Sequence, residues 1–199
     1  DADGRLHWTA PPGGKWTLYA VFLGWHGKQV ERAGPGGEGD VIDHFSRESL
    51  HRYLNVFDAA YAKHGVPALR AYFNDSYEVD DAKGEANWTP GFFAQFQRRR
   101  GYDLRDELPA FFGNDTPEKN SRVRADHRET ISDLLLEEFT VPWAKWARRN
   151  GAVVRNQAHG SPANIIDLYA ASDIPETEGS HVIGMKFASS AAHLTGKTL

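Results

Sequence analysis

Two carboxylates follow an apolar segment of this chain at the point where a strand would leave a sheet. Residues 69–73 cluster apolar side chains as a buried strand does, and Asp75 and Glu78 come directly after them. Carboxylates at the carboxyl ends of strands are where α/β barrels keep their chemistry. We therefore interpret Glu78 as a candidate catalytic acid. Asp75 either orients Glu78 or a substrate hydroxyl, or caps the turn.

A second segment, residues 173–178, also places carboxylates beside a predicted strand. Glu176 and Glu178 are two residues apart, so on an extended chain they point the same way and repel each other unless a cation lies between them. A hard cation such as Ca²⁺ takes oxygen ligands of this kind, whereas a solvated acidic turn is the simpler alternative. Two acids on different strands are also what acid/base hydrolysis of a glycosidic bond needs.

Residues 155–160 are polar at the end of an otherwise apolar strand. Asn156 and His159 there suit the binding of sugar hydroxyls, although a single histidine is more often a structural hydrogen-bond donor. The sequence has no histidine pair at metal-binding spacing and no serine in a nucleophile elbow. It therefore does not support a zinc hydrolase or an esterase.

The elements that must position these side chains alternate between strands and helices. Strands are predicted at residues 16–23, 69–73 and 152–157, with another beginning at Ile174 and a short segment at 182–187. Helices are predicted from the N-cap Ser46 to a stop at 65–67, from a first turn at Pro90 to near Gly101, partially over 104–112, over about 121–150 with a kink at Pro142, and over 162–171.

This alternation predicts an α/β fold with a parallel sheet of about four βα units. A closed eight-stranded barrel takes about 250 residues, more than the 199 present. We therefore expect a partial (β/α)₈ TIM-barrel catalytic domain, with residues 1–199 a fragment of one such domain. A compact open α/β domain is the alternative.

Composition narrows the classes of function. The net charge of -4 and the absence of a basic stripe give no reason to expect a nucleic-acid partner. The run at 98–100 is expected to face solvent at a helix end, and the glycine-rich run at 34–39 to be a flexible connection. No apolar run approaches the ~20 residues that cross a bilayer, and the absence of cysteine excludes disulfides. The chain opens at Asp1 without an initiator methionine, so the lack of a signal peptide is uninformative.

Taken together, these segments resemble glycoside hydrolase family 106, the inverting α-L-rhamnosidases. The resemblance extends from about Trp16 onward in consistent order. The matching segments are Asp75-Ser76-Tyr77-Glu78, Phe96 with Gly101-Tyr102-Asp103-Leu104, Leu108-Pro109, Gln157-Ala158-His159-Gly160, Asp173-Ile174-Pro175-Glu176-Thr177-Glu178, and Lys186-Phe187-Ala188-Ser189-Ser190-Ala191-Ala192-His193-Leu194 with Gly196-Lys197.

The resemblance implies a barrel enzyme that hydrolyses terminal α-L-rhamnosides of plant polysaccharides or glycosides, with a bound calcium near the sugar. It makes Glu78 the general acid and places Glu176 and Glu178 close to the calcium. Within this chain the catalytic candidates are Glu78 and Glu178, and the metal candidates are Glu176 and Glu178. The substrate-binding candidates are Asp75, Asn156, His159 and Asp173. A periplasmic or secreted location also follows from the resemblance.

One departure from the family pattern leaves other interpretations open. In such enzymes a further glutamate, a candidate general base, follows on the strand after the helix that ends near Leu194, and this chain ends at Leu199. A non-catalytic, calcium-dependent carbohydrate-binding protein is one alternative. A retaining glycosidase of another barrel family is the other, because retention takes carboxyl groups only ~5–5.5 Å apart and inversion takes ~6.5–9.5 Å.

Overall fold

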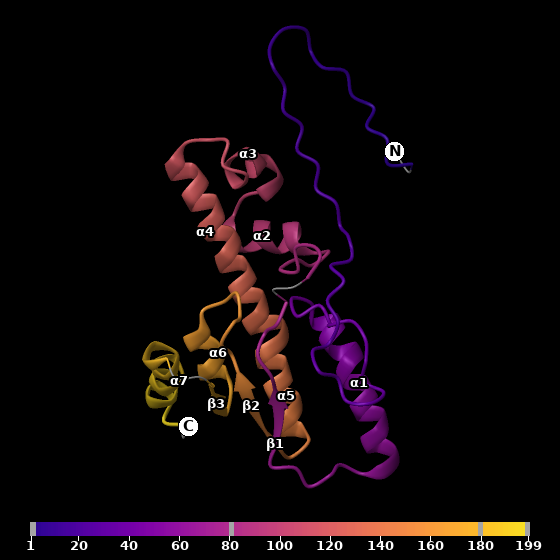
Figure 1. Ribbon diagram of the computed structural model, residues 1–199, viewed down its shortest axis with the longest axis vertical. Helices are drawn as coiled ribbons and strands as arrows, with labels where there is room; N and C mark the ends of the chain where they lie inside the picture. Colours follow the sequence, from indigo (N-terminus) through magenta and orange to yellow (C-terminus); the bar gives the residue numbers. More distant parts are fainter. Residues whose placement is uncertain (1–2, 80–81, 179–180, 198–199) are drawn as a thin grey trace.

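The computed structural model describes residues 3–79, 82–178 and 181–197. A three-stranded parallel sheet of order β1-β2-β3 lies in the lower half of the view in Figure 1. Its strands are β1 (Ala71–Asn74), β2 (Val153–Gln157) and β3 (Ile174–Glu176). The predicted α/β class and parallel topology are thus confirmed. The described residues form three strands of this sheet rather than four.

Helices connect and cover these strands. They are α1 (Arg47–His64), α2 (Phe92–Arg100), α3 (Leu108–Phe111), α4 (Pro117–Leu134), α5 (Val141–Arg149), α6 (Ile165–Ala171) and α7 (Val182–Thr195), with a 3₁₀ turn at Leu104–Glu107 and a π-helical turn at Leu135–Thr140. Residues 182–187 open α7 because the alanine- and serine-rich run that follows them continues the helix.

Local signals set the ends of α1 as predicted. The Ser46 Oγ accepts a hydrogen bond from the Ser49 N–H at 3.3 Å, which caps the first turn. Gly65 ends the helix with φ of 81°, a conformation that costs glycine little because it has no Cβ. Leu50 and Leu54 point into the core between these two ends.

The long helical segment differs from its prediction at both its start and its middle. It begins at Pro117, because Thr116 caps it and proline suits the first helical position. A π-helical turn then replaces the predicted simple kink just before Pro142. Proline has no N–H to donate, so the preceding turn is free to widen, and the Thr140 hydroxyl donates to the Leu135 carbonyl at 3.1 Å across it.

The two faces of the sheet are covered differently. On one face Val154 is fully buried and the Tyr72 ring lies 4.8 Å from the Trp146 ring of α5. On the other face Phe73 is exposed, and the Arg155 guanidinium lies 4.4 Å above its ring. The register produces this contact, since Phe73 and Arg155 are paired between β1 and β2.

The predicted solvent-facing role of the basic run at the end of α2 is wrong for two of its residues. Arg99 pairs with Glu137 at 2.8 Å and Arg100 with Glu129 at 3.0 Å, and both guanidinium-bearing side chains are largely buried. The last turn of α2 faces Glu129 of α4 and Glu137 of the π-helical turn that continues α4. These ion pairs therefore join the two helices.

The predicted strand at residues 16–23 is also wrong. This segment runs apart from the sheet and makes no strand pairing among the described residues (Figure 1). Phe22 is 87% exposed and Trp16 is 54% exposed, while Tyr19 stacks on Phe112 at 5.5 Å. High β-propensity alone does not make a strand, because a strand needs a partner to bond and a face to bury.

Candidate active site

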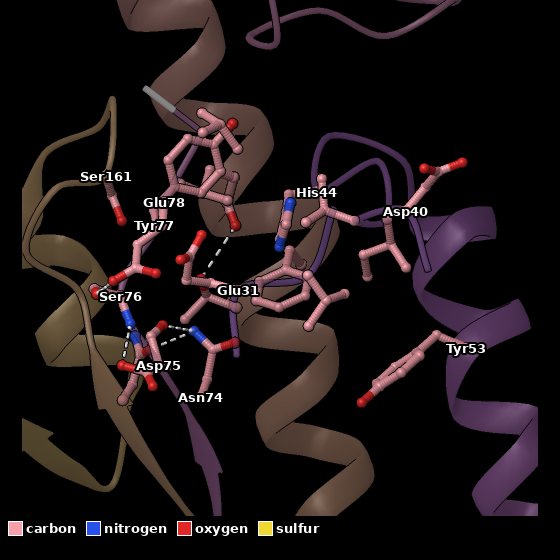
Figure 2. Close-up of a pocket in the computed structure, with 18 of the residues that line it drawn as sticks. Glu31, Asp40, His44, Tyr53, Asn74, Asp75, Ser76, Tyr77, Glu78 and Ser161 are labelled. Carbon is pink, nitrogen blue, oxygen red and sulfur yellow. Dashed lines mark hydrogen bonds between the residues drawn. The ribbon is translucent and has the colours of Figure 1, made fainter. Parts of the chain in front are cut away.

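A pocket of about 420 Å³ lies at the carboxyl end of β1. Its walls are the loop after β1, the π-helical turn and the hairpin formed by residues 28–41, hereafter the hairpin (Figure 2). The polar side chains that face it include Glu31, Asp40, His44, Asn74, Asp75 and Glu78. The structure thus places two of the predicted acids, Asp75 and Glu78, in one pocket.

Paired strands supply the inner wall of the pocket. The Asn74 Nδ2 donates to the Asn156 Oδ1 at 2.8 Å, because the two residues are partners in the β1–β2 register. Asn156 is only 4% exposed, yet it lines the same pocket as Glu78. The structure therefore brings the predicted sugar-binding residue Asn156 to the candidate acid.

The loop that carries Glu78 is ordered by short-range hydrogen bonds. The Asp75 Oδ1 accepts from the Ser76 N–H at 2.9 Å, and the Ser76 hydroxyl donates to the Glu78 Oε1 at 3.0 Å. Both carboxylates are exposed to solvent. The Asp75 carboxylate thus stabilises the turn by accepting from its backbone, and the Ser76 hydroxyl links that turn to the Glu78 carboxylate.

Tyr77 anchors this loop to its neighbours. Its hydroxyl donates to the Asn87 Oδ1 at 2.9 Å, and burial raises the pKa of its phenol. Gly160, with φ of 78°, brings the loop after β2 so close that a Cβ there would lie 3.1 Å from the Tyr77 carbonyl oxygen. Glu78 therefore stands on a backbone that is held from two sides.

His44 packs between the Tyr77 ring at 5.3 Å and the Phe139 ring at 4.8 Å. Burial, together with the charge of His26, lowers the pKa of His44 to about 4, so the imidazole is neutral near pH 7. The sequence analysis missed His44. No local pattern marks it, because its surroundings come from the π-helical turn and the loop after β1.

This lowered pKa predicts a specific acid sensitivity. Between the ordinary pKa of 6.5 and about 4, the unfolded chain binds a proton at His44 that the folded chain does not. Stability from this residue is therefore fully present above pH 6.5 and is lost as the pH falls toward 4, by roughly 3 kcal/mol in total. Urea unfolding between pH 7 and 4 measures it.

The variant His44→Gln should show a flatter loss of stability with acid than the unmodified protein. The exposed His64 offers a matched control, since His64→Gln should leave the slope unchanged. Equal slopes for His44→Gln and the unmodified protein would contradict the assignment.

Two further predicted acids, Glu176 and Glu178, lie at the carboxyl end of β3. Glu176 pairs with Arg155 at 2.5 Å and accepts from the Gln157 Nε2 at 3.0 Å, because β2 and β3 place Gln157 opposite Glu176. Glu178 is 72% exposed, and its carboxylate lies 3.9 Å from the His159 Nε2. Arg155 thus offsets the charge of Glu176, while Glu178 projects into solvent near His159.

Asp173 lies at the opposite edge of the sheet from the other candidates. It precedes β3, so it stands at the amino end of a parallel strand. Its carboxylate accepts from the Val154 N–H at 3.0 Å and pairs with Arg148 at 2.5 Å. The structure therefore gives Asp173 a contact that joins strand and helix, and does not bring it to the pocket.

The described residues contain no group of three or more His, Asp or Glu side chains that could hold a metal ion. Oxygen donors do gather at the β2–β3 edge, however. Glu176 and Glu178 are there, and the buried Gln157 Oε1 has no hydrogen-bond partner. Their chemistry fits calcium, but calcium takes six to eight oxygens, so these three side chains form only part of a ligand set.

The hairpin was the other feature that the sequence analysis missed. The expected flexible connection at 34–39 is instead closed by two backbone hydrogen bonds, from the Val30 N–H to the Gly39 carbonyl at 2.8 Å and from the Val41 N–H to the Lys28 carbonyl at 3.2 Å. The acids on either side of the glycine run, Glu31 and Asp40, were the available signal.

A parallel sheet with an exposed carboxylate after β1 and further acids at the end of β3 presents the residue type that hydrolysis of a glycosidic bond uses. The comparisons with known proteins agree. The family model described as alpha-L-rhamnosidase, glycoside hydrolase family 106, matches residues 1–199. The chain belongs to this family.

Two relatives show how far the similarity extends. The structure of a rhamnosidase from Novosphingobium sp. PP1Y is 33% identical, with a TM-score of 0.68 over 84% of this chain and 18% of that one. A Formosa agariphila protein named "Putative beta-glucuronidase" is 29% identical over 98% of this chain and 17% of its own length. The chain thus spans less than a fifth of either relative.

A search of the described helices finds none long and apolar enough to span a membrane.

Proposed function

We propose that this chain is part of the catalytic domain of an enzyme that hydrolyses terminal α-L-rhamnosides of plant polysaccharides or glycosides with inversion. The observation that carries the proposal is Glu78, a solvent-accessible carboxylate at the carboxyl end of β1 in a pocket of about 420 Å³. Membership of the rhamnosidase family supports the same chemistry. A partial TIM barrel and export from the cytoplasm remain parts of this proposal.

In the proposed mechanism Glu78 protonates the glycosidic oxygen as the bond to the sugar breaks. A second carboxylate then removes a proton from a water molecule on the opposite face of the ring. Glu178 is the candidate for that base within this chain, since it is exposed at the β3 end beside His159. Asp75, Asn156 and His159 are the proposed contacts to sugar hydroxyls.

Calcium is part of the proposal: the Glu176 and Glu178 carboxylates and the Gln157 Oε1, which has no hydrogen-bond partner, would be among its ligands, and further oxygens would complete the set. When bound, it would supply positive charge that holds neighbouring hydroxyls of the sugar. Arg155 competes for the Glu176 carboxylate. Glu178 is therefore the more available of the two glutamates.

A second candidate function is β-glucuronidase, which only the name of the Formosa relative favours. Para-nitrophenyl α-L-rhamnoside and para-nitrophenyl β-D-glucuronide separate the two in the protein that carries this chain. We expect release of nitrophenol from the rhamnoside alone, with a β-configured first sugar product by proton NMR and loss of rate in EDTA that calcium restores. Hydrolysis of the glucuronide alone would overturn the proposal, and an α-configured first product would indicate retention.

A further inference from the structure

The charged side chains that line the pocket are all of one sign in the described part of the chain. They are Glu31, Glu38, Asp40, Asp75 and Glu78, and the same lining holds no lysine or arginine. Three of the five come from the hairpin, and Figure 2 shows Glu31 toward the loop that carries Glu78 and Asp40 on the far side of His44. The pocket is therefore lined by acids from two separate segments of the chain.

The nearby groups that could offset this charge do so only in part. The Lys28 side chain is 5% exposed and its Nζ lies 2.8 Å from Glu31, so its charge is directed to the hairpin itself. His44 is neutral near pH 7 because it is enclosed by Tyr77 and Phe139. Neither group presents a cation to a ligand.

The hairpin holds its acids in place rather than leaving them on a loose loop. An antiparallel bridge joins Gln29 to Asp40, and the Gln29 side-chain amide also donates to the Asp40 carboxylate. Glu38 lies two residues earlier, beside the Gly39 carbonyl that bonds to Val30. The negative wall is thus part of the ordered pocket.

We infer that the hairpin is an electrostatic filter that admits neutral glycosides and disfavours glycosides that carry a carboxylate, such as uronic acid units. This inference rests on the proposed function of the pocket. Proteins bind carboxylates through arginine or lysine, and like charges placed together weaken binding. A pocket with acids and no cation therefore selects by charge against anionic ligands.

Two substrates of the same sugar test this inference in the protein that carries the chain: para-nitrophenyl α-L-rhamnoside, and the same compound with a carboxylate on its phenyl ring. We expect kcat/KM to be about tenfold lower for the anionic substrate at low salt. The ratio between the two should shrink in the double variant Glu38→Gln/Asp40→Asn and in added salt. The carboxylate also changes the reactivity of the phenol leaving group, but this change is the same for every variant. Comparing the ratio of the two kcat/KM values between variants therefore cancels it.

The double variant Asp106→Asn/Glu118→Gln is the matched control, because it removes two exposed acids at the α3–α4 end of the molecule and changes net charge equally. It should leave the ratio unchanged. Suppose that Glu38→Gln/Asp40→Asn hydrolyses the neutral rhamnoside but leaves the ratio of the two kcat/KM values unchanged. The inference of an electrostatic filter is then wrong, and the glycosidase proposal stands. If neither rhamnoside is hydrolysed, the proposed function fails and the filter fails with it.

Discussion

Replacing Glu78 with glutamine is expected to lower kcat for para-nitrophenyl α-L-rhamnoside by about 10³-fold while the affinity for rhamnose survives. Glutamine keeps the size of the side chain and can still contact Ser76, but it has no proton to give to the leaving oxygen. Steady-state kinetics measure the loss, and calorimetric titration with rhamnose measures the affinity.

The leaving group distinguishes an acid from a merely structural residue. A dinitrophenyl rhamnoside needs little protonation, so its hydrolysis should fall much less in Glu78→Gln than that of a poor leaving group. Glu118→Gln, at an exposed glutamate of the first turn of α4, is the control and should retain full activity. Near-normal turnover in Glu78→Gln, or equal losses with both leaving groups, would show that Glu78 is not the acid.

The largest expected effect on stability is at Trp146, which joins α1, α5 and the sheet. Its indole ring lies 4.8 Å from Tyr72 and 6.2 Å from Tyr61, and its Nε1–H donates to the Asp58 carboxylate at 2.7 Å. We expect Trp146→Ala to reduce the free energy of unfolding by about 3–5 kcal/mol. Urea denaturation followed by circular dichroism measures this change.

A matched substitution tests whether burial is the cause. Trp16 is the same residue type but is 54% exposed, so Trp16→Ala should change stability by less than about 0.5 kcal/mol. Trp146→Phe keeps an aromatic ring and should cost less than alanine, which keeps the test informative if Trp146→Ala does not fold. Similar losses at positions 16 and 146 would contradict the packing argument.

Local chemistry explains what was predictable about the fold. Ser46, whose side chain accepts a hydrogen bond from a backbone N–H of the first turn, marked the start of α1. Gly65, which tolerates a positive φ, marked its end, and both signals act within a single turn. The β-branched start of the segment at 152–157 marked β2, and this signal is also local in sequence. The segment at 16–23 has an equally strong pattern but no sheet to join among the described residues. Pattern therefore predicts a strand only where a partner exists.

The candidate site divides in the same way. Glu78 and Asp75 were predicted because an acid that follows a parallel strand must lie at its carboxyl edge. By the same reasoning Asp173, which precedes β3, lies at the far edge, although its segment resembles the family as closely. The roles of Asp75, Glu78 and Glu178 in catalysis or binding remain predictions, as does calcium.

By itself, the sequence determined the α/β class, the parallel sheet, both ends of α1 and the place of Glu78, since each depends on neighbours in the chain or on strand direction. Only the tertiary structure decided that Arg155 pairs with Glu176, that His44 is neutral between Tyr77 and Phe139, and that the hairpin acids line the same pocket as Glu78. These contacts join residues far apart in sequence. Their energies depend on burial and register, which exist only once the chain has packed.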